Sequence, residues 1–304
     1  MEGYLSVKEV LEKYIEGCQS KSQMSTSRMF GKAVLAGIMI GMGAAASSVA
    51  AHSISNVGLA RLAAAVVFPV GLMMVILLGA ELFTGDCLVA MGVFDGRQKI
   101  RNVINILVIV YLGNFVGATL LASLVSMSGQ LNYSGGLLGA YTIKVAVGKI
   151  NLSFGEGIVS GILCNILVCA AVLMAMSAKD VTGKLLASFF TIMLFVTAGF
   201  EHCVANMYYI TAGILAMHNT QYREVAMSSY GYTMEQLEQL NLVQYFFANL
   251  LPVTIGNIIG GILFVGAPMF YLNTNKEFKL RTVVKKEENK HVIAFSELSA
   301  DSTR

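Results

Sequence analysis

Six long apolar stretches divide the chain of 304 residues, and each approaches or exceeds the ~20 residues that a helix needs to cross a bilayer. They cover residues 30–51, 61–94, 102–127, 154–178, 185–217 and 242–272. The second and fifth stretches are long for one span, and a polar cluster interrupts each of them. We therefore predict an all-α membrane protein with six transmembrane helices, of which the second and fifth are broken at mid-membrane.

The two interruptions have similar sequences, GAELFTGD at 79–86 and GFEHCVAN at 199–206. Aligned without a gap, Glu81 matches Glu201, and Asp86 matches Asn206. A bilayer core offers no water to a carboxylate or a freed peptide group, so such a break persists only where protein or a water-filled path surrounds it. Breaks at corresponding places in two halves of a chain indicate a transport site.

The similarity between the halves extends beyond the interruptions. Glycine motifs recur at equal spacing in the first and fourth stretches and again in the third and sixth; the pairs are Phe30-Gly31-x5-Gly37 with Phe154-Gly155-x5-Gly161, and Gly113-Asn114-x2-Gly117 with Gly256-Asn257-x2-Gly260. Because three is odd, the second half of a three-plus-three duplication must insert upside down relative to the first. The sequence therefore predicts two inverted three-helix repeats.

Charge sets the orientation. Only 13% of the residues are charged and 56% are hydrophobic, which excludes an ordinary soluble domain. With the amino terminus in the cytoplasm, seventeen of the 21 Lys and Arg residues lie inside, and the four outside are Arg61, Lys144, Lys149 and Arg223. The positive-inside rule then predicts a protein of the cell membrane with both termini on the cytoplasmic side. We expect membrane lipid, and no nucleic acid, among the partners.

Three regions follow from this pattern. Residues 1–28 are predicted to form a cytoplasmic amphipathic helix lying along the membrane or a neighbouring subunit, residues 29–274 the pore domain, and residues 275–304 a basic cytoplasmic tail. The apolar face of the first helix is expected to comprise Val7, Val10, Leu11, Tyr14 and Cys18. Residues 128–153 and 218–241 are predicted to be external loops, with capping boxes at Ser153-x-x-Glu156 and Thr233-x-x-Gln236.

The chemistry of the interruptions favours an anion. In this topology both restarting half-helices point their N-termini at the middle of the membrane, and free amide groups with the positive end of the helix dipole attract negative charge there. Thr84 and Asp86 are suited to cap the first restart. We expect Glu81 and Glu201 to lie behind the pore and to accept hydrogen bonds from the looped backbone; the alternative is that they line it.

His202 and four bulky side chains are the other candidates near the interruptions. A histidine in apolar sequence is often a hydrogen-bonded core residue, but beside a mirrored break it suits donation of a hydrogen bond or a proton to an anion near physiological pH. We therefore expect a channel that depends on pH, with His202 as the pH-sensitive element. Bulky apolar residues are placed where they could narrow a pore or simply pack between helices; they are Phe68, Leu72, Leu82 and Phe195.

Four motifs in order resemble the formate/nitrite transporter family. They are GAELFTG at 79–85, CNILVC at 164–169, GFEHCVAN at 199–206 and PVTIGN at 252–257, and the resemblance covers about residues 5–275. It implies an aquaporin-like six-helix fold, a homopentamer with one pore per protomer, and passage of small monovalent anions, alone or with a proton. Formate is the first choice of anion, with nitrite and hydrosulfide as alternatives.

The same resemblance implies roles for individual residues. It implies a polar centre formed by Thr84, His202 and Asn257, and narrow points at Phe68, Leu72, Leu82 and Phe195. It also implies a vestibule cation at Lys149 and supporting side chains at Glu81, Glu201, Asn165 and Asn206. Lys149 has a simpler alternative, an interfacial lysine that only marks the end of its loop.

A membrane-embedded enzyme is the main alternative from another class. The sequence contains no H-E-x-x-H motif, nucleophile elbow or cofactor fingerprint, and its four histidines are too far apart in sequence to suggest a metal cluster. We expect no catalytic residues, no cofactor and no bound metal. Within transport, a channel and an alternating-access carrier both fit the sequence.

Overall fold

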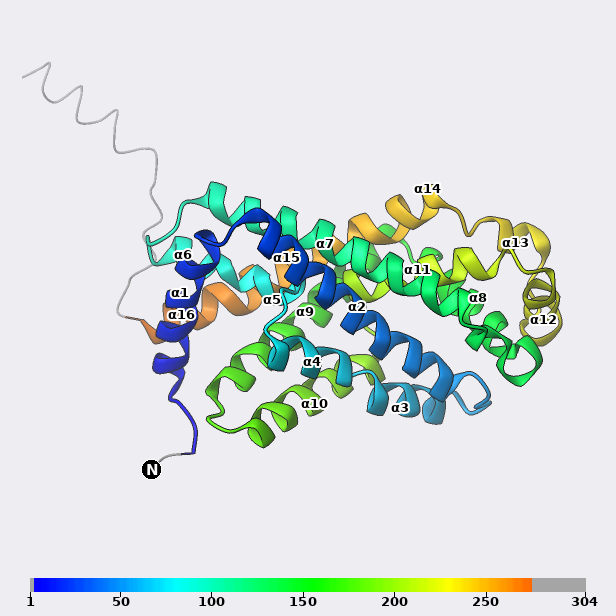
Figure 1. The fold of residues 1–304 in the computed structure, drawn as a ribbon, viewed down its shortest axis with the longest axis horizontal. Helices are drawn as coiled ribbons and strands as arrows, with labels where there is room; N and C mark the ends of the chain where they lie inside the picture. Colours follow the sequence, from blue (N-terminus) through cyan, green and yellow to red (C-terminus); the bar gives the residue numbers. More distant parts are fainter. Residues whose placement is uncertain (1–2, 275–304) are drawn as a thin grey trace, which may run out of the picture. The chain divides into compact units, whose positions relative to one another are not determined.

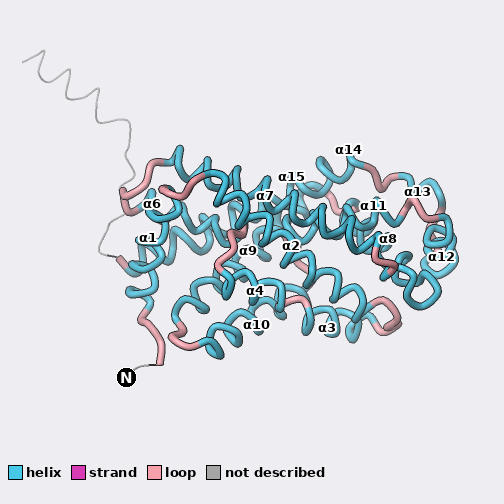
Figure 2. Tube along the Cα trace, viewed as in Figure 1, coloured by secondary structure: helices cyan, strands magenta, loops and turns pink. Residues whose placement is uncertain are grey.

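A computed structural model describes residues 3–274, and helices account for nearly all of them (Figure 2). Within this range six helical stretches are long and apolar enough to cross a membrane; they are Thr26–Ala51, Val57–Leu78, Ile100–Met127, Phe154–Ser177, Val181–Ala198 and Leu242–Asn273. The predictions of an all-helical chain and of six apolar spans are confirmed for the described residues. The predicted tail, 275–304, lies outside them.

The first helix, α1 (Val7–Ser22), starts at a capping box formed by Ser6 and Glu9. Its buried face contains four of the five predicted residues, but Val7 is 47% exposed, so its assignment to that face was wrong. The face packs against α6 (Met91–Phe94) and α16 (Ala267–Asn273), which lie beside α1 in Figure 1. This buried face is therefore covered by its own chain.

Two pairs of long helices cross closely. The helix α2 (Thr26–Ala51) packs most extensively against α7 (Ile100–Met127), and α9 (Phe154–Ser177) packs against α15 (Leu251–Ile259). A Cβ on Gly117 would overlap the Val34 carbonyl oxygen, and one on Gly256 would overlap that of Ile158. The recurring glycine motifs thus allow backbone-to-backbone contact at both crossings.

Each of the two predicted interruptions is a short non-helical segment between helices. After α3 (Val57–Val67) and α4 (Val70–Leu78), residues 79–82 are non-helical, and the chain continues through α5 (Phe83–Asp86), the 3₁₀ turn η1 (Cys87–Ala90) and α6. Likewise α10 (Val181–Ala198) and α11 (Cys203–Ala216) are separated by non-helical residues 199–202. Gly79 and Gly199 end α4 and α10 with φ of 65° and 76°, a left-handed conformation that favours glycine.

The segment 128–153 is not the loop that was predicted. It holds η2 (Gln130–Gly136) and then α8 (Leu137–Ile150), which buries Leu138 and Ile143 and packs against α11. This helix is too short to span a bilayer and carries two lysines, so its sequence lacks the signal that marked the other helices. Both predicted capping boxes are confirmed: one starts α9 and the other starts α13 (Met234–Glu238), which follows α12 (Thr220–Tyr230).

The last span contains two π-helical stretches. It runs through α14 (Leu242–Gln244), the π-helical η3 (Tyr245–Leu250), α15, the π-helical η4 (Gly260–Gly266) and α16. The first of these π-helical stretches carries Asn249, whose side chain is fully buried against the second interruption. Single π turns often mark functional positions in helices.

Candidate functional site

One asparagine holds the backbone of the first interruption. The Asn114 side chain, from α7, accepts a hydrogen bond from the Phe83 amide at 2.9 Å and donates to the carbonyl oxygens of Glu81 at 2.9 Å and Ala33 at 2.8 Å. It therefore satisfies backbone groups on both sides of residue 82. Asn114 was visible in the repeated glycine motif but absent from the predicted site.

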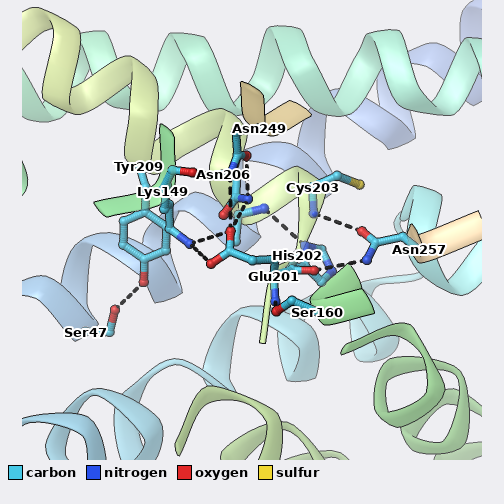
Figure 3. Close-up of polar contacts among 11 residues, drawn as sticks. Ser47, Lys149, Ser160, Glu201, His202, Cys203, Asn206, Tyr209, Asn249 and Asn257 are labelled. Atoms are coloured by element: carbon cyan, nitrogen blue, oxygen red, sulfur yellow. Dashed lines mark hydrogen bonds and ion pairs between the residues drawn. The ribbon is translucent and has the colours of Figure 1, made fainter. Parts of the chain in front are cut away.

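Asn257, from α15, does the same at the second interruption. Its side chain accepts from the Cys203 amide at 2.9 Å and donates to the carbonyl oxygens of Glu201 at 3.0 Å and Gly161 at 2.8 Å (Figure 3). The amide thus holds the peptide groups that flank His202. The polar centre predicted from Thr84, His202 and Asn257 is accordingly divided, with the first two in direct contact and Asn257 bonded to backbone.

His202 and Thr84 bring the two interruptions together. The imidazole Nε2 lies 2.9 Å from the Thr84 hydroxyl, and Nδ1 accepts from the Ala205 amide at 3.1 Å, so His202 also caps α11. Because Nδ1 accepts, the proton of the neutral ring resides on Nε2, which donates to Thr84. Both side chains are buried. The hydroxyl proton of Thr84 then remains available to a further acceptor.

The four predicted narrow points lie in two groups. The rings of Phe68 and Phe195 meet edge to face with centroids 5.6 Å apart, and Phe195 stacks on His202 at 6.0 Å. Phe68, Phe195 and His202 line a cavity of about 470 Å³, hereafter the larger cavity. Leu72 and Leu82 line a second one of about 240 Å³, the smaller cavity. No residue lines both; His202 lines the larger cavity, and its partner Thr84 is flanked in sequence by Leu82 and Gly85, which line the smaller one.

Glu201 is held by side chains rather than by the looped backbone. Its carboxylate accepts from the Lys149 ammonium at 2.9 and 3.1 Å, from Asn206 at 2.6 Å and from Asn249 at 3.4 Å (Figure 3). The prediction that it accepts from the interruption's own amides was wrong, because Asn257 meets that backbone instead. Lys149 lines the larger cavity, as a vestibule residue should, but its charge is paired with Glu201.

Glu81 is also paired with a lysine, which the sequence did not reveal. Lys21 of α1 contacts the Glu81 carboxylate at 2.6 Å and also binds Asp86, while Lys32 is 3.9 Å from Glu81. Burial opposes the charged form of Lys21, but the carboxylates of Asp86 and Glu81 outweigh that effect and raise its pKa above the ordinary value. The helix α1 is distant from residues 81–86 in sequence and approaches them only in the folded chain.

The two remaining predicted residues connect these groups. The Asn165 side chain donates to the backbone carbonyls of Thr84 at 3.1 Å and Asn257 at 2.6 Å, and so ties the first interruption to α15. Asn206 contacts both Glu201 and Asn249. Every predicted supporting side chain therefore packs around an interruption. Within residues 3–274 no group of three or more metal-binding side chains comes together.

Comparison with known proteins agrees with this architecture. A family model described as Formate/nitrite transporter matches residues 8–271. The formate channel FocA of Haemophilus influenzae is 39% identical over 218 residues, covering 71% of this chain and 75% of the relative. A probable formate transporter of Methanothermobacter thermautotrophicus is 32% identical, covering 84% and 94%. A solved structure titled as a pentameric formate channel with formate bound superposes with a TM-score of 0.72 at 30% identity, covering 81% of this chain and 97% of that one.

Proposed function

The chain belongs to the formate/nitrite transporter family, and from this premise we propose that it conducts small monovalent anions across a cell membrane, with formate as the first candidate. The observation that carries the proposal is the buried contact of His202, which lines the larger cavity, with Thr84, whose neighbours Leu82 and Gly85 line the smaller one. Polar groups that can donate to an anion thus lie next to both cavities, beside the bulky apolar side chains that line them. Nitrite and hydrosulfide are the alternative substrates.

The two restarting helices support an anion rather than a cation. Both α5 and α11 begin within the site, at Phe83 and Cys203, so their positive dipole ends face the region around Thr84 and His202. The nearby carboxylates of Glu81 and Glu201 are each paired with a lysine. An anion entering the site thus meets helix N-termini and hydrogen-bond donors, while Lys149 offsets Glu201 and Lys21 is shared between Glu81 and Asp86.

The apolar narrow points oppose a bare charge. Transfer of an unpaired charge into such surroundings costs several kcal/mol even after relaxation, whereas the neutral conjugate acid is much cheaper to move. We propose that an anion is stabilised or protonated at the pair formed by His202 and Thr84. For protonation, the Thr84 hydroxyl gives its proton to the anion and takes the Nε2 proton of His202, and water in the larger cavity, which His202 lines, returns a proton to the ring, so that no permanent imidazolium is held. The Nδ1 bond to the Ala205 amide, which requires an unprotonated nitrogen, supports this neutral relay.

The proposal includes a membrane arrangement and an assembly. The halves are inverted repeats with both interruptions at mid-membrane, residues 29–274 form the pore domain, and both termini are cytoplasmic. The larger cavity then opens outside and the smaller cavity inside. The neighbour described as pentameric supports a homopentamer with a pore in each protomer.

A competition flux assay tests the substrate. The full-length protein is reconstituted in liposomes, and uptake of labelled formate is measured with nitrite, hydrosulfide or a larger anion outside. We expect formate uptake above that of protein-free vesicles, inhibited by small monovalent anions and unaffected by the larger one. Absence of flux for all three small anions would contradict the proposed function. Stronger uptake of nitrite or hydrosulfide than of formate would change the substrate but keep the class.

A further inference from the structure

Cations gather at the larger cavity. Of the four Lys and Arg residues that the predicted topology places outside, three line it: Arg61, Lys144 and Lys149. Glu201 is the only acid among its lining residues. The fourth outside cation, Arg223, is absent from the lining and donates instead to the Met217 carbonyl and the Thr220 hydroxyl. The cavity therefore has an excess of positive charge.

That excess does not come from Lys149. Its ammonium contacts both carboxylate oxygens of Glu201, at 2.9 and 3.1 Å, and its side chain is only 15% exposed. The field of such a close, opposite pair falls off much faster than that of a single charge. Lys149 is thus committed to holding Glu201, and to an approaching anion the pair is nearly neutral.

Arg61 and Lys144 are in a different situation. Both are exposed, and within residues 3–274 neither forms an ion pair with a carboxylate. The Arg61 guanidinium lies against Gly199, at the start of the second interruption. The Lys144 ammonium lies over the Tyr230 ring, 4.4 Å from its centroid, and is 5.9 Å from that of Tyr141. An aromatic face attracts a cation without cancelling its charge, so the charge of Lys144 remains available to an anion. The charge of Arg61 remains available because no carboxylate of the described residues pairs with it.

We propose that Arg61 and Lys144 form a capture site for a small monovalent anion such as a monocarboxylate at the mouth of the larger cavity, while Lys149 positions Glu201. The inference rests on the proposed function and refines it by separating recruitment from support of the interruption. A planar guanidinium suits a carboxylate with two oxygens, and an ammonium adds a second, rotatable donor. Capture raises the local concentration of the anion before it loses water at Phe68 and Phe195.

A capture site predicts a particular kinetic signature. Exposed charges are screened over about 8 Å at physiological salt, so their effect must be large at low ionic strength and weak at high ionic strength. It must also appear at low substrate concentration and vanish at saturation. A purely structural role of Arg61, holding the end of α10, would lower flux at every salt and substrate concentration.

The test uses formate uptake into liposomes containing the full-length protein, at low and high ionic strength. The double variant Arg61→Gln/Lys144→Gln should raise the half-saturating formate concentration about three- to tenfold at low salt. It should leave the maximal flux unchanged and match the wild type at high salt. Arg61→Lys keeps the charge and should retain most of the low-salt uptake. Arg223→Gln, which removes an outside cation away from the cavity, is the matched control and should behave as wild type.

The possible outcomes distinguish failure of the capture site from failure of the proposed anion transport. Wild-type flux with an unaltered double variant, or a loss that persists at high salt, would overturn the capture site and leave the proposed function intact. Absence of small-anion flux in the wild type would overturn both. A salt titration of the wild type alone is a second measurement that needs no variant: uptake at low formate should fall as salt rises, and salt-independent uptake would also overturn the capture site.

Discussion

The two interruptions have the same backbone support but different charge balance. At each, one buried asparagine accepts from the first amide of the restarting helix and donates to the carbonyl two residues earlier. The carboxylates, in contrast, are neutralised differently. Glu201 has Lys149 and two amide side chains, whereas Glu81 shares Lys21 with a second acid, Asp86. The backbone requirement is thus met identically, while the surrounding charges are free to differ.

An amide suits this position because it offers both a donor and an acceptor. A freed peptide group in a bilayer must find a partner within the protein, and a break in a helix frees an N–H and a C=O together. A carboxylate could accept but not donate, so Glu81 and Glu201 could not have satisfied both groups. The comparison therefore explains why Asn114 and Asn257, rather than the glutamates, hold the backbone.

The largest expected effect comes from removing these asparagines. Asn114→Leu or Asn257→Leu keeps a similar shape but leaves two backbone groups of the interruption without a partner, the first amide of the restarting helix and the carbonyl two residues earlier. Each unsatisfied buried group costs about 1–3 kcal/mol, so each variant should lose about 2–6 kcal/mol. Thermal unfolding of the purified protein in detergent measures the loss. Clearly unequal losses in the two variants would break the equivalence of the interruptions.

The next effect concerns the lysine at the second interruption. Lys149→Gln leaves the buried Glu201 carboxylate without its cation, which costs about 3–5 kcal/mol for a buried pair. The double variant Lys149→Gln/Glu201→Gln removes both charges and should recover most of the thermal stability. If the single variant is as stable as wild type, Lys149 does not support Glu201.

A smaller effect is expected at the first interruption, because Lys32 remains near Glu81 when Lys21 is replaced. Lys21→Gln leaves Glu81 and Asp86 as neighbouring acids with less positive charge. Its stability deficit relative to wild type should therefore shrink as the pH falls, since protonation of one acid removes their repulsion.

Adding Asp86→Asn makes the first interruption resemble the second, where the aligned residue is Asn206. This double variant should remove both the deficit and its pH dependence. A deficit in Lys21→Gln that is the same at all pH values, or that Asp86→Asn leaves unchanged, would argue against charge as the cause.

Sequence patterns located the interruptions because their causes are local. A glycine that can adopt positive φ, followed by an acid inside an apolar run, is visible without any tertiary information. The repeated Gly-Asn motif, from which the sequence predicted a duplication, is equally visible, and in the structure it lies at the closely packed crossings of α7 and α15 with their partners. The capping boxes at Ser153 and Thr233 are equally local, and both were predicted correctly.

Other features depend on contacts between distant parts of the chain. Lys21 reaches Glu81 across sixty residues, and no periodicity in α1 distinguishes it from a solvated lysine. The pairing of Lys149 with Glu201 was missed for the same reason, so its charge was expected to be free. The helix α8 escaped prediction because it packs on α11 without crossing a bilayer, and its sequence is neither long nor strongly apolar.

The central claim is that His202 is the pH-sensitive element of an anion pore. It is tested by recording formate uptake and internal pH together in liposomes, for the wild type and for His202→Asn, over a range of outside pH. We predict that wild-type uptake depends on pH and acidifies the interior. In His202→Asn, the pH dependence and the proton movement should disappear, leaving at most a passive anion leak. Full pH dependence in His202→Asn, in protein that remains folded and assembled, would contradict the account.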